Sequence, residues 1–254
     1  MKKLLLTTIV SVLLVSAAVA QTATPKNIYY KISFPNAVHH EAEIVMTIPE
    51  APAGILSLHM SRSSAGRYAT HEFGKNIYNV KATNVDGTPI EIKQTAGDVY
   101  EIAEHGDAVK ISYTLFANWT DGTYASIDPS HAHLNMPAVF LWFANTGQDQ
   151  RPIKFEFNDL DKYGWKVATQ LKHEGLNIYS APNMQYMMDS PTELSNFKET
   201  SWDVVNTDGK QERINLTIHS NDDQGVIDNF GKMIQKVVLE EKAVYGELPT
   251  YDYG

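Results

Sequence analysis

The stretch His40-Glu41-Ala42-Glu43-Ile44-Val45-Met46-Thr47-Ile48 carries an apolar side chain at every second position from Ala42 to Ile48. Side chains of a β-strand point to opposite faces in turn, so Ala42, Ile44, Met46 and Ile48 would share one face. The pattern predicts a half-buried strand.

Similar runs continue through most of the chain, separated by turn residues at fairly regular intervals. Between the runs 77–85 and 88–92, Asp86-Gly87 predicts a hairpin, because glycine supplies the positive φ of a tight turn. Short alternating runs divided by turn residues are typical of antiparallel sheets. The other expected strands cover 28–34, 55–60, 99–102, 109–116, 139–143, 153–157, 165–169, 177–180, 200–205 and 213–219.

The pattern changes at Ser220, where apolar residues begin to recur at spacings of three and four. They predict an amphipathic helix of about five turns, with Ser220 or Asn221 as its cap and Asp222 and Asp223 near its positive end. The apolar positions are Val226, Ile227, Phe230, Met233, Ile234, Val237 and Val238. We therefore expect a mainly β fold, an antiparallel β-sandwich or saddle-like sheet over residues 21–220, followed by this helix and the start of a further domain over 221–254.

The first twenty residues have the features of an export signal. Lys2 and Lys3 precede an apolar run from Leu4 to Val15, and Ala18-Val19-Ala20 supplies the small residues of a cleavage site. The alternative is a membrane anchor, but the apolar run is shorter than the roughly 20 residues that a span needs. We expect a periplasmic or secreted protein without a membrane anchor after cleavage.

The composition narrows the function classes. The formal net charge of −9 disfavours nucleic acid and anionic lipid as partners. The absence of cysteine excludes thiol catalysis and cysteine-based zinc sites. The aromatic residues, which include 13 Tyr and 9 Phe, allow either a sugar-binding surface or an ordinary β core.

No catalytic motif is present in the sequence. A helical HExxH site needs two histidines four residues apart, and the pairs that begin at His40, His71 and His173 lack the second histidine. His131 and His133 would point the same way on a strand and are candidate metal ligands, with Asp128 nearby. The alternative is a polar loop with two ordinary histidines.

Several segments in the same order resemble the glycyl-aminopeptidase family of zinc metallopeptidases (metallopeptidase family sixty-one). Gly66 and Tyr68 match one loop of that family, although its tryptophan and proline are absent here. The segments 165–171 and 187–191 match the family patterns W-x-v-a-T-x-L and L-v-D-s-P, and 245–253 is similar to a third. The matching motif residues are Gly66, Trp165, Thr169, Asp189, Ser190 and Pro191.

Members of that family have an N-terminal β domain and a catalytic domain with HExxH. The resemblance implies that this chain is a non-catalytic front domain, from a truncated, split or fragmentary member, with zinc only in the missing catalytic domain. Its partners would be a peptide or that catalytic domain. We expect the loop 62–73 to line the substrate cleft through Arg62, Arg67, Tyr68 and His71, the alternative being a plain surface loop. An independent periplasmic peptide- or glycan-binding module is the alternative function.

Overall fold

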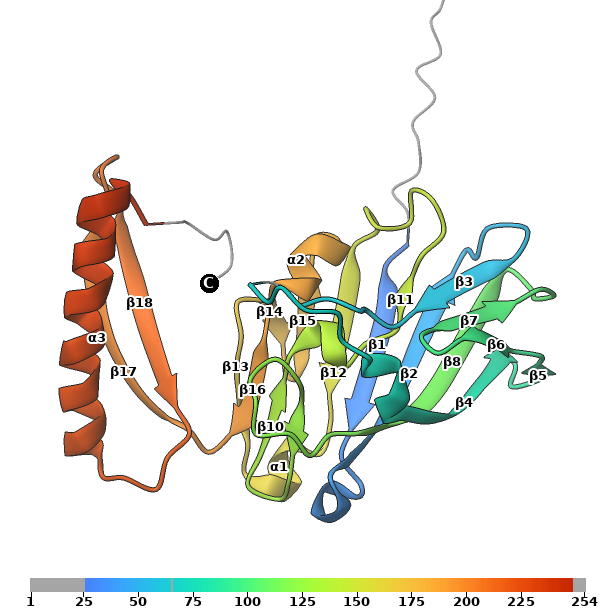
Figure 1. Ribbon diagram of the computed structural model, residues 1–254, viewed down its shortest axis with the longest axis horizontal. Helices are drawn as coiled ribbons and strands as arrows, with labels where there is room; N and C mark the ends of the chain where they lie inside the picture. Colours follow the sequence, from blue (N-terminus) through green and yellow to red (C-terminus); the bar gives the residue numbers. More distant parts are fainter. Residues whose placement is uncertain (1–25, 65, 249–254) are drawn as a thin grey trace, which may run out of the picture.

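The computed structural model describes residues 26–64 and 66–248, in which β-strands are the dominant element. The largest sheet has eight strands in the order β14-β15-β12-β1-β2-β8-β4-β5 (Figure 1). All neighbours in it pair antiparallel except β1 and β12, which are parallel, with Ile28 beside Ile153. The strands are β1 (Ile28–Ser33), β2 (Glu41–Pro49), β4 (Ile77–Asn84), β5 (Pro89–Ile90), β8 (Ala108–Phe116), β12 (Ile153–Phe157), β14 (Lys172–Gly175) and β15 (Ile178–Ala181).

Two four-stranded sheets, ordered β13-β16-β10-β9 and β11-β3-β7-β6, complete the part of the chain that we call the β domain, residues 27–197. Their strands are β13 (Lys166–Ala168), β16 (Thr192–Ser195), β10 (His131–Leu134), β9 (Ser126–Ile127), β11 (Trp142–Phe143), β3 (Leu56–His59), β7 (Val99–Ile102) and β6 (Lys93–Ala96). The short helices are α1 (Leu160–Tyr163), α2 (Met184–Met188) and the 3-10 turns η1 (Ala37–His39), η2 (Phe73–Asn76) and η3 (Met136–Ala138).

The three sheets of the β domain enclose its core. Ala42, Ile44, Met46 and Ile48 are each 0 % exposed, which confirms the face predicted from their alternation. They belong to one cluster with the buried side chains of β3, β7 and β8, so the sheets share a single core. The predicted hairpin is also present, with β4 paired to β5 and Gly87 at φ 90°.

One predicted strand, 139–143, is mostly wrong. Only Trp142 and Phe143 form a strand, preceded by η3 and an irregular segment. The backbone of that segment is bound by side chains instead of a ladder. Tyr113 Oη donates to Val139 O and accepts from Leu141 N, each at 3.0 Å, and Tyr30 Oη donates to Leu141 O at 2.8 Å. Apolar periodicity does not reveal this, because buried loops and buried strands have the same composition.

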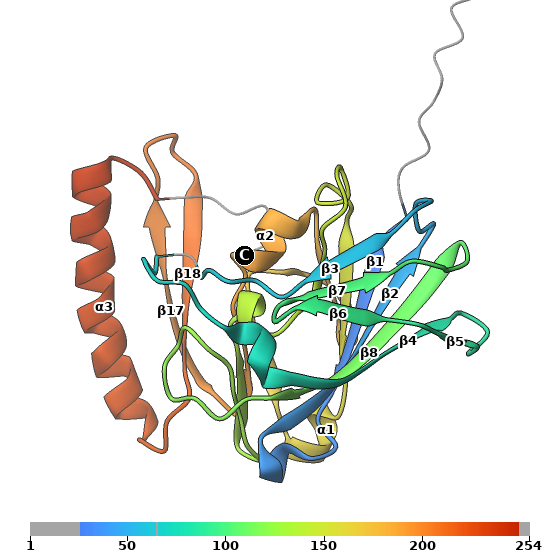
Figure 2. The ribbon, with the colours of Figure 1, turned by 45° about the vertical axis from the view of Figure 1, so that its right-hand side comes forward.

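The remaining elements form what we call the hairpin–helix unit, residues 198–245. It consists of β17 (Lys198–Val205), β18 (Gln211–Ile218) and α3 (Gln224–Tyr245). In the described residues the two strands pair only with each other, and α3 packs on β17. Figures 1 and 2 show α3 on the outer side of the hairpin, away from the β domain. The boundary expected at residue 220 falls within this unit.

The start of α3 differs from the sequence expectation. Its cap is Asp223, whose side chain accepts from Val226 N at 3.0 Å, and not Ser220 or Asn221. Ser220 Oγ instead binds Asp222 within the preceding turn. The single long C-terminal helix and the mainly β fold are confirmed. Within the described residues, no helix combines the length and apolarity needed to cross a bilayer. The predicted export signal, residues 1–20, lies outside those residues.

Candidate functional site

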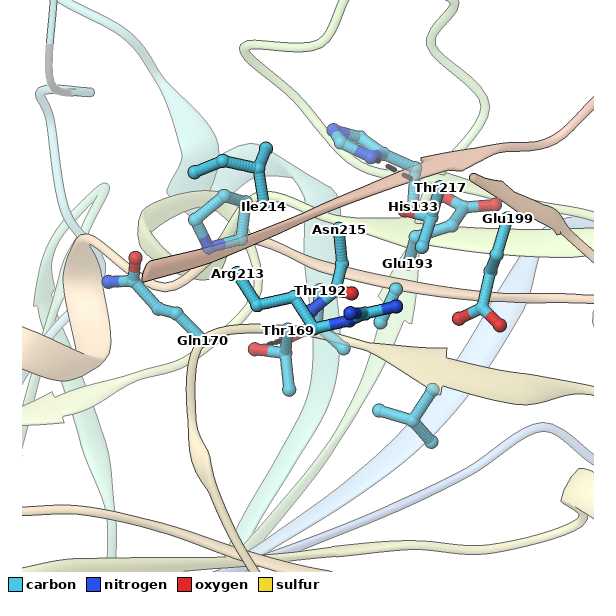
Figure 3. A pocket seen from close by; sticks show the side chains of 13 residues that line it. His133, Thr169, Gln170, Thr192, Glu193, Glu199, Arg213, Ile214, Asn215 and Thr217 are labelled. Carbon is cyan, nitrogen blue, oxygen red and sulfur yellow. Dashed lines mark hydrogen bonds and ion pairs between the residues drawn. The ribbon is translucent and has the colours of Figure 1, made fainter. Parts of the chain in front are cut away.

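A groove of about 620 Å³ lies between the β domain and the hairpin–helix unit (Figure 3). One wall is β18, and the other is formed by β13 and β16 with the segments beside them. We call it the hairpin groove. Figure 3 shows Gln170 toward one end and His133 with Glu193 toward the other. Its lining comprises His133, Val167, Ala168, Thr169, Gln170, Pro191, Thr192, Glu193, Glu199, Arg213, Ile214, Asn215 and Thr217.

Three histidines surround one carboxylate at an end of this groove; we call His131, His133, Glu193 and His219 the His–Glu cluster. Strand β10 pairs antiparallel with β16, which puts His133 directly opposite Glu193. Glu193 Oε1 lies 3.4 Å from His131 Nδ1 and 3.9 Å from His219 Nδ1, and Oε2 lies 3.6 Å from His133 Nδ1. The expectation that His131 and His133 face the same way is therefore confirmed.

The electrostatics of the cluster favour its charged form. Burial alone would raise the pKa of Glu193, but contacts with His131 and His133 outweigh it and lower the pKa to about 2. The same contact with Glu193 raises the pKa of His131 and of His133 against the opposing effect of burial. Asp128 adds to this at His131, since its Oδ2 lies 3.6 Å from His131 Nε2.

Two of the family-like segments meet at the other end of the groove. Thr192 donates through Oγ1 to Thr169 Oγ1 at 3.0 Å. Gln170 Nε2 donates to Asp189 O at 2.8 Å and to Ser190 Oγ at 3.1 Å. Pro191 lines the groove beside them. These residues hold the segment before β16 against the segment after β13, so they shape the groove wall.

Trp165 has a different place. It is 6 % exposed and packs in the core, stacked on Tyr163 at 4.5 Å and edge-on to Phe34 at 5.1 Å. This motif residue therefore supports the fold and does not reach the groove.

The loop 62–73 lies apart from the groove lining, and its four candidate residues do not form one site. Arg67 donates to Asp121 at 2.7 Å and to Thr123 at 2.6 Å. Arg62 and His71 line a separate cavity of about 430 Å³. Tyr68 is fully exposed, and Gly66 has a φ of 74°, which a turn here requires.

The loop 62–73 and the His–Glu cluster are linked through the short segment 121–123. Residue 122, between the two contacts of Arg67, has its carbonyl oxygen 3.4 Å from His133 Nε2. The loop thus anchors the segment that borders the His–Glu cluster. His71 faces inward and stacks on Phe73 with 4.8 Å between ring centroids.

Sequence reasoning missed Glu193 and His219. Glu193 is one acidic residue on a short strand, and His219 follows β18 by one residue. They are separated from His131 by long stretches of chain, so no local motif joins them. The only usable signal was strand pairing, because a correct β10–β16 register would have placed Glu193 opposite His133.

The cluster is chemically able to hold a cation. The ligand atoms of His131, Glu193 and His219 all lie within 4.8 Å of one another. It is unrelated to a helical HExxH site, because its members lie on or beside strands.

Comparisons with known proteins identify the fold. The family model for the peptidase M61 N-terminal domain matches residues 29–196. A crystal structure of an aminopeptidase N family protein from Idiomarina loihiensis matches with a TM-score of 0.75 at 19 % identity. That match covers 88 % of this chain and 38 % of the Idiomarina chain. A comparison with curated proteins gave no match.

Two further solved structures have lower scores. An M1 zinc metallopeptidase from Deinococcus radiodurans has a TM-score of 0.37 at 8 % identity, covering 76 % of this chain and 46 % of its own. Aminopeptidase A from Legionella pneumophila has a TM-score of 0.41 at 10 % identity, covering 75 % of this chain and 23 % of its own.

Proposed function

Because this chain belongs to the family of peptidase M61 N-terminal domains, we propose that it serves as the non-catalytic front domain of an aminopeptidase. In this role it braces a catalytic domain of the same type and does not itself cleave peptides. The observation that carries the proposal is the family match over residues 29–196, which coincides with the β domain. The lack of HExxH in the sequence supports the non-catalytic part.

An apolar surface on α3 supports a docking role. Val226, Phe230, Met233 and Val237 recur at spacings of four, three and four, so they share one stripe along the helix. They are 44–63 % exposed: Val226 49 %, Phe230 44 %, Met233 63 % and Val237 51 %. Contiguous exposed apolar surface marks an interaction site. We propose that the catalytic domain packs on this stripe.

We also propose that the loop 62–73 and the hairpin groove face the substrate cleft. The groove offers the remaining hydrogen-bonding capacity of Thr169, of the Gln170 amide oxygen and of Arg213. The Gln170 amide nitrogen already donates to Asp189 O and Ser190 Oγ, and Arg213 also contacts Asp203 and Ser201. These groups can hydrogen-bond the main chain of an extended peptide. In an assembled enzyme they would form one wall of the cleft. Export to the periplasm or beyond, through the signal in residues 1–20, completes the proposal.

Activity assays test the non-catalytic role. The purified mature chain, incubated with glycyl and alanyl arylamides, should release no product with or without added zinc. Chelator-sensitive turnover from a homogeneous preparation would contradict the proposal.

Binding assays test the bracing role, with a separately produced M61-type catalytic domain as the probe. The unaltered chain should bind it, and Phe230→Asp with Met233→Asp should abolish binding, because charges would have to be buried in an apolar contact. The control is Lys232→Asp with Lys236→Asp, two exposed positions of the same helix that lie outside the stripe. Equal binding by both double variants would refute docking on the stripe. Capture of peptides or glycans without the catalytic domain would favour an independent binding module.

A further inference from the structure

The His–Glu cluster draws its members from both parts of the molecule. His131 and Glu193 lie on the paired strands β10 and β16 of the β domain. His219 comes from the hairpin–helix unit, immediately after β18. Lys198 Nζ donates to Ser220 O at 3.0 Å, which holds the end of β18 against the start of β17. The third imidazole is therefore positioned by its own unit.

The spacing of the ligand atoms suits a tetrahedral ion. Zinc binds imidazole nitrogen and carboxylate oxygen at about 2.0–2.1 Å, so two ligand atoms of a tetrahedral site lie about 3.4 Å apart. His131 Nδ1 and Glu193 Oε1 are 3.4 Å apart. His219 Nδ1 is 3.9 Å from the same oxygen, and the ligand atoms of all three residues lie within 4.8 Å of one another, so His219 would have to move inward to complete the tetrahedral spacing. The rings of His131 and His219 lie side by side, with centroids 4.6 Å apart and an interplanar angle of 29°.

The shared oxygen is buried but has only loose contacts. Glu193 Oε1 lies 3.4 Å from His131 Nδ1 and 3.9 Å from His219 Nδ1, and within the described residues no donor reaches it with full hydrogen-bonding geometry. Ser195 also lies against this carboxylate and helps to lower its pKa. A buried carboxylate oxygen without a well-formed hydrogen bond is costly. A cation between Oε1 and the two Nδ1 atoms would satisfy it.

The surroundings match those of a metal-binding histidine. His131 turns Nδ1 toward Glu193 and Nε2 toward Asp128 Oδ2, at 3.6 Å. A carboxylate on the far nitrogen fixes the ring and raises its basicity as a ligand. His133 contacts the second oxygen of Glu193 at 3.6 Å and so orients the carboxylate.

We propose that His131, Glu193 and His219 bind one divalent transition-metal ion of the zinc type, and that this ion fastens the hairpin–helix unit to the β domain. Two imidazoles and a carboxylate suit zinc, copper or nickel better than calcium or magnesium. Ion binding adds its free energy to the attachment of the unit, because a site divided between the two parts is complete only when they are docked.

Calorimetric titration of the purified full chain with zinc chloride tests the site. We expect one saturable equivalent, weakened at least about tenfold in His219→Ala and in Glu193→Gln. The control is His39→Ala, which removes an exposed histidine outside the cluster. Absence of saturable binding, or equal affinity in His219→Ala and the unaltered chain, would overturn the site. Glu193→Gln preserves side-chain shape and decides the matter should His219→Ala fail to fold.

Hydrogen exchange tests the fastening. Zinc should slow exchange in β17, β18 and α3 while leaving β8 unchanged, and the effect should vanish in His219→Ala. Zinc binding without slower exchange in the hairpin–helix unit would refute the fastening role. Both readouts are independent of peptidase activity, so they stand or fall separately from the proposed front-domain function.

Discussion

The β domain and the hairpin–helix unit are both amphipathic, yet they cover their apolar faces to different extents. In the β domain, Ile44 and Met46 of β2 are 0 % exposed. On α3, Ile227 is 2 % exposed, whereas Val226 and Met233 remain 49 % and 63 % exposed. Periodicity thus predicts that a face is apolar, but not that anything covers it. The β domain is stabilised by its own core. The stability of α3 depends on its contacts with the hairpin and on any partner that covers its exposed apolar stripe.

The largest difference should appear between Phe155→Ala and Phe230→Ala. Phe155 is 1 % exposed and packs against Tyr30 and Phe140, so truncation should lower the free energy of unfolding by about 3–5 kcal/mol. Phe230 is 44 % exposed, and its truncation should cost less than about 1 kcal/mol. Urea unfolding followed by circular dichroism measures both. If Phe230→Ala lowers the free energy of unfolding as much as Phe155→Ala does, the apolar stripe of α3 is covered in solution. The proposed difference between the β domain and α3 would then be wrong.

The next largest difference should appear at alkaline pH, which should destabilise the β domain before the hairpin–helix unit. Burial, with the charge of Tyr113 as a smaller cause, raises the pKa of Tyr30, and burial raises the pKa of Tyr113 above its usual range. The unfolded chain ionises these phenols near about pH 10. The stability tied to them is therefore fully present below that pH and is lost as the pH rises toward the folded-state values. Between residues 198 and 248 the only tyrosine is Tyr245, and it is 80 % exposed.

Urea midpoints measured between neutral pH and about pH 11 should therefore fall for the β domain first. Tyr30→Phe should flatten this fall, although it removes the hydrogen bond to Leu141 O and lowers stability at neutral pH by about 1–3 kcal/mol. An equally steep alkaline fall in Tyr30→Phe would show that burial of this phenol is not its cause.

The smallest effect concerns the contact between α3 and β17. An added Cβ at Gly231 would lie 2.5 Å from Thr200 Cγ2, and the β-branched side chain of Thr200 has little freedom to move. Gly231→Ala should loosen the helix by about 1–3 kcal/mol, despite the better helix propensity of alanine. Combined with Thr200→Ser, which removes Cγ2, the same change should be neutral or stabilising by up to about 1 kcal/mol.

Hydrogen exchange of α3 amides, compared with those of β8, measures this local effect. If the double change is as destabilising as Gly231→Ala alone, the close approach to Thr200 is not the constraint. If exchange in β8 rises together with that in α3, the two parts unfold as one, and the distinction between them fails.

Local chemistry was enough to predict several features of this protein. The alternation of Ala42 to Ile48, the Asp86-Gly87 turn and the three- and four-residue spacing after Val226 depend on neighbours within a few positions, so they can be recognised along the chain. The absence of HExxH is likewise a property of the sequence itself. The ordered motif segments predicted the family, which the match over residues 29–196 confirms.

Tertiary structure decided the rest, because it depends on pairings between distant segments. The parallel β1–β12 pair joins Ile28 to Ile153, and the phenol of Tyr113 replaces the ladder that would have made 139–141 a strand. The His–Glu cluster depends on the β10–β16 register together with the docking of the hairpin beside them. His131 and His133 were visible as a pair in the sequence, but Glu193 and His219 became their partners only through long-range packing, which leaves no local pattern.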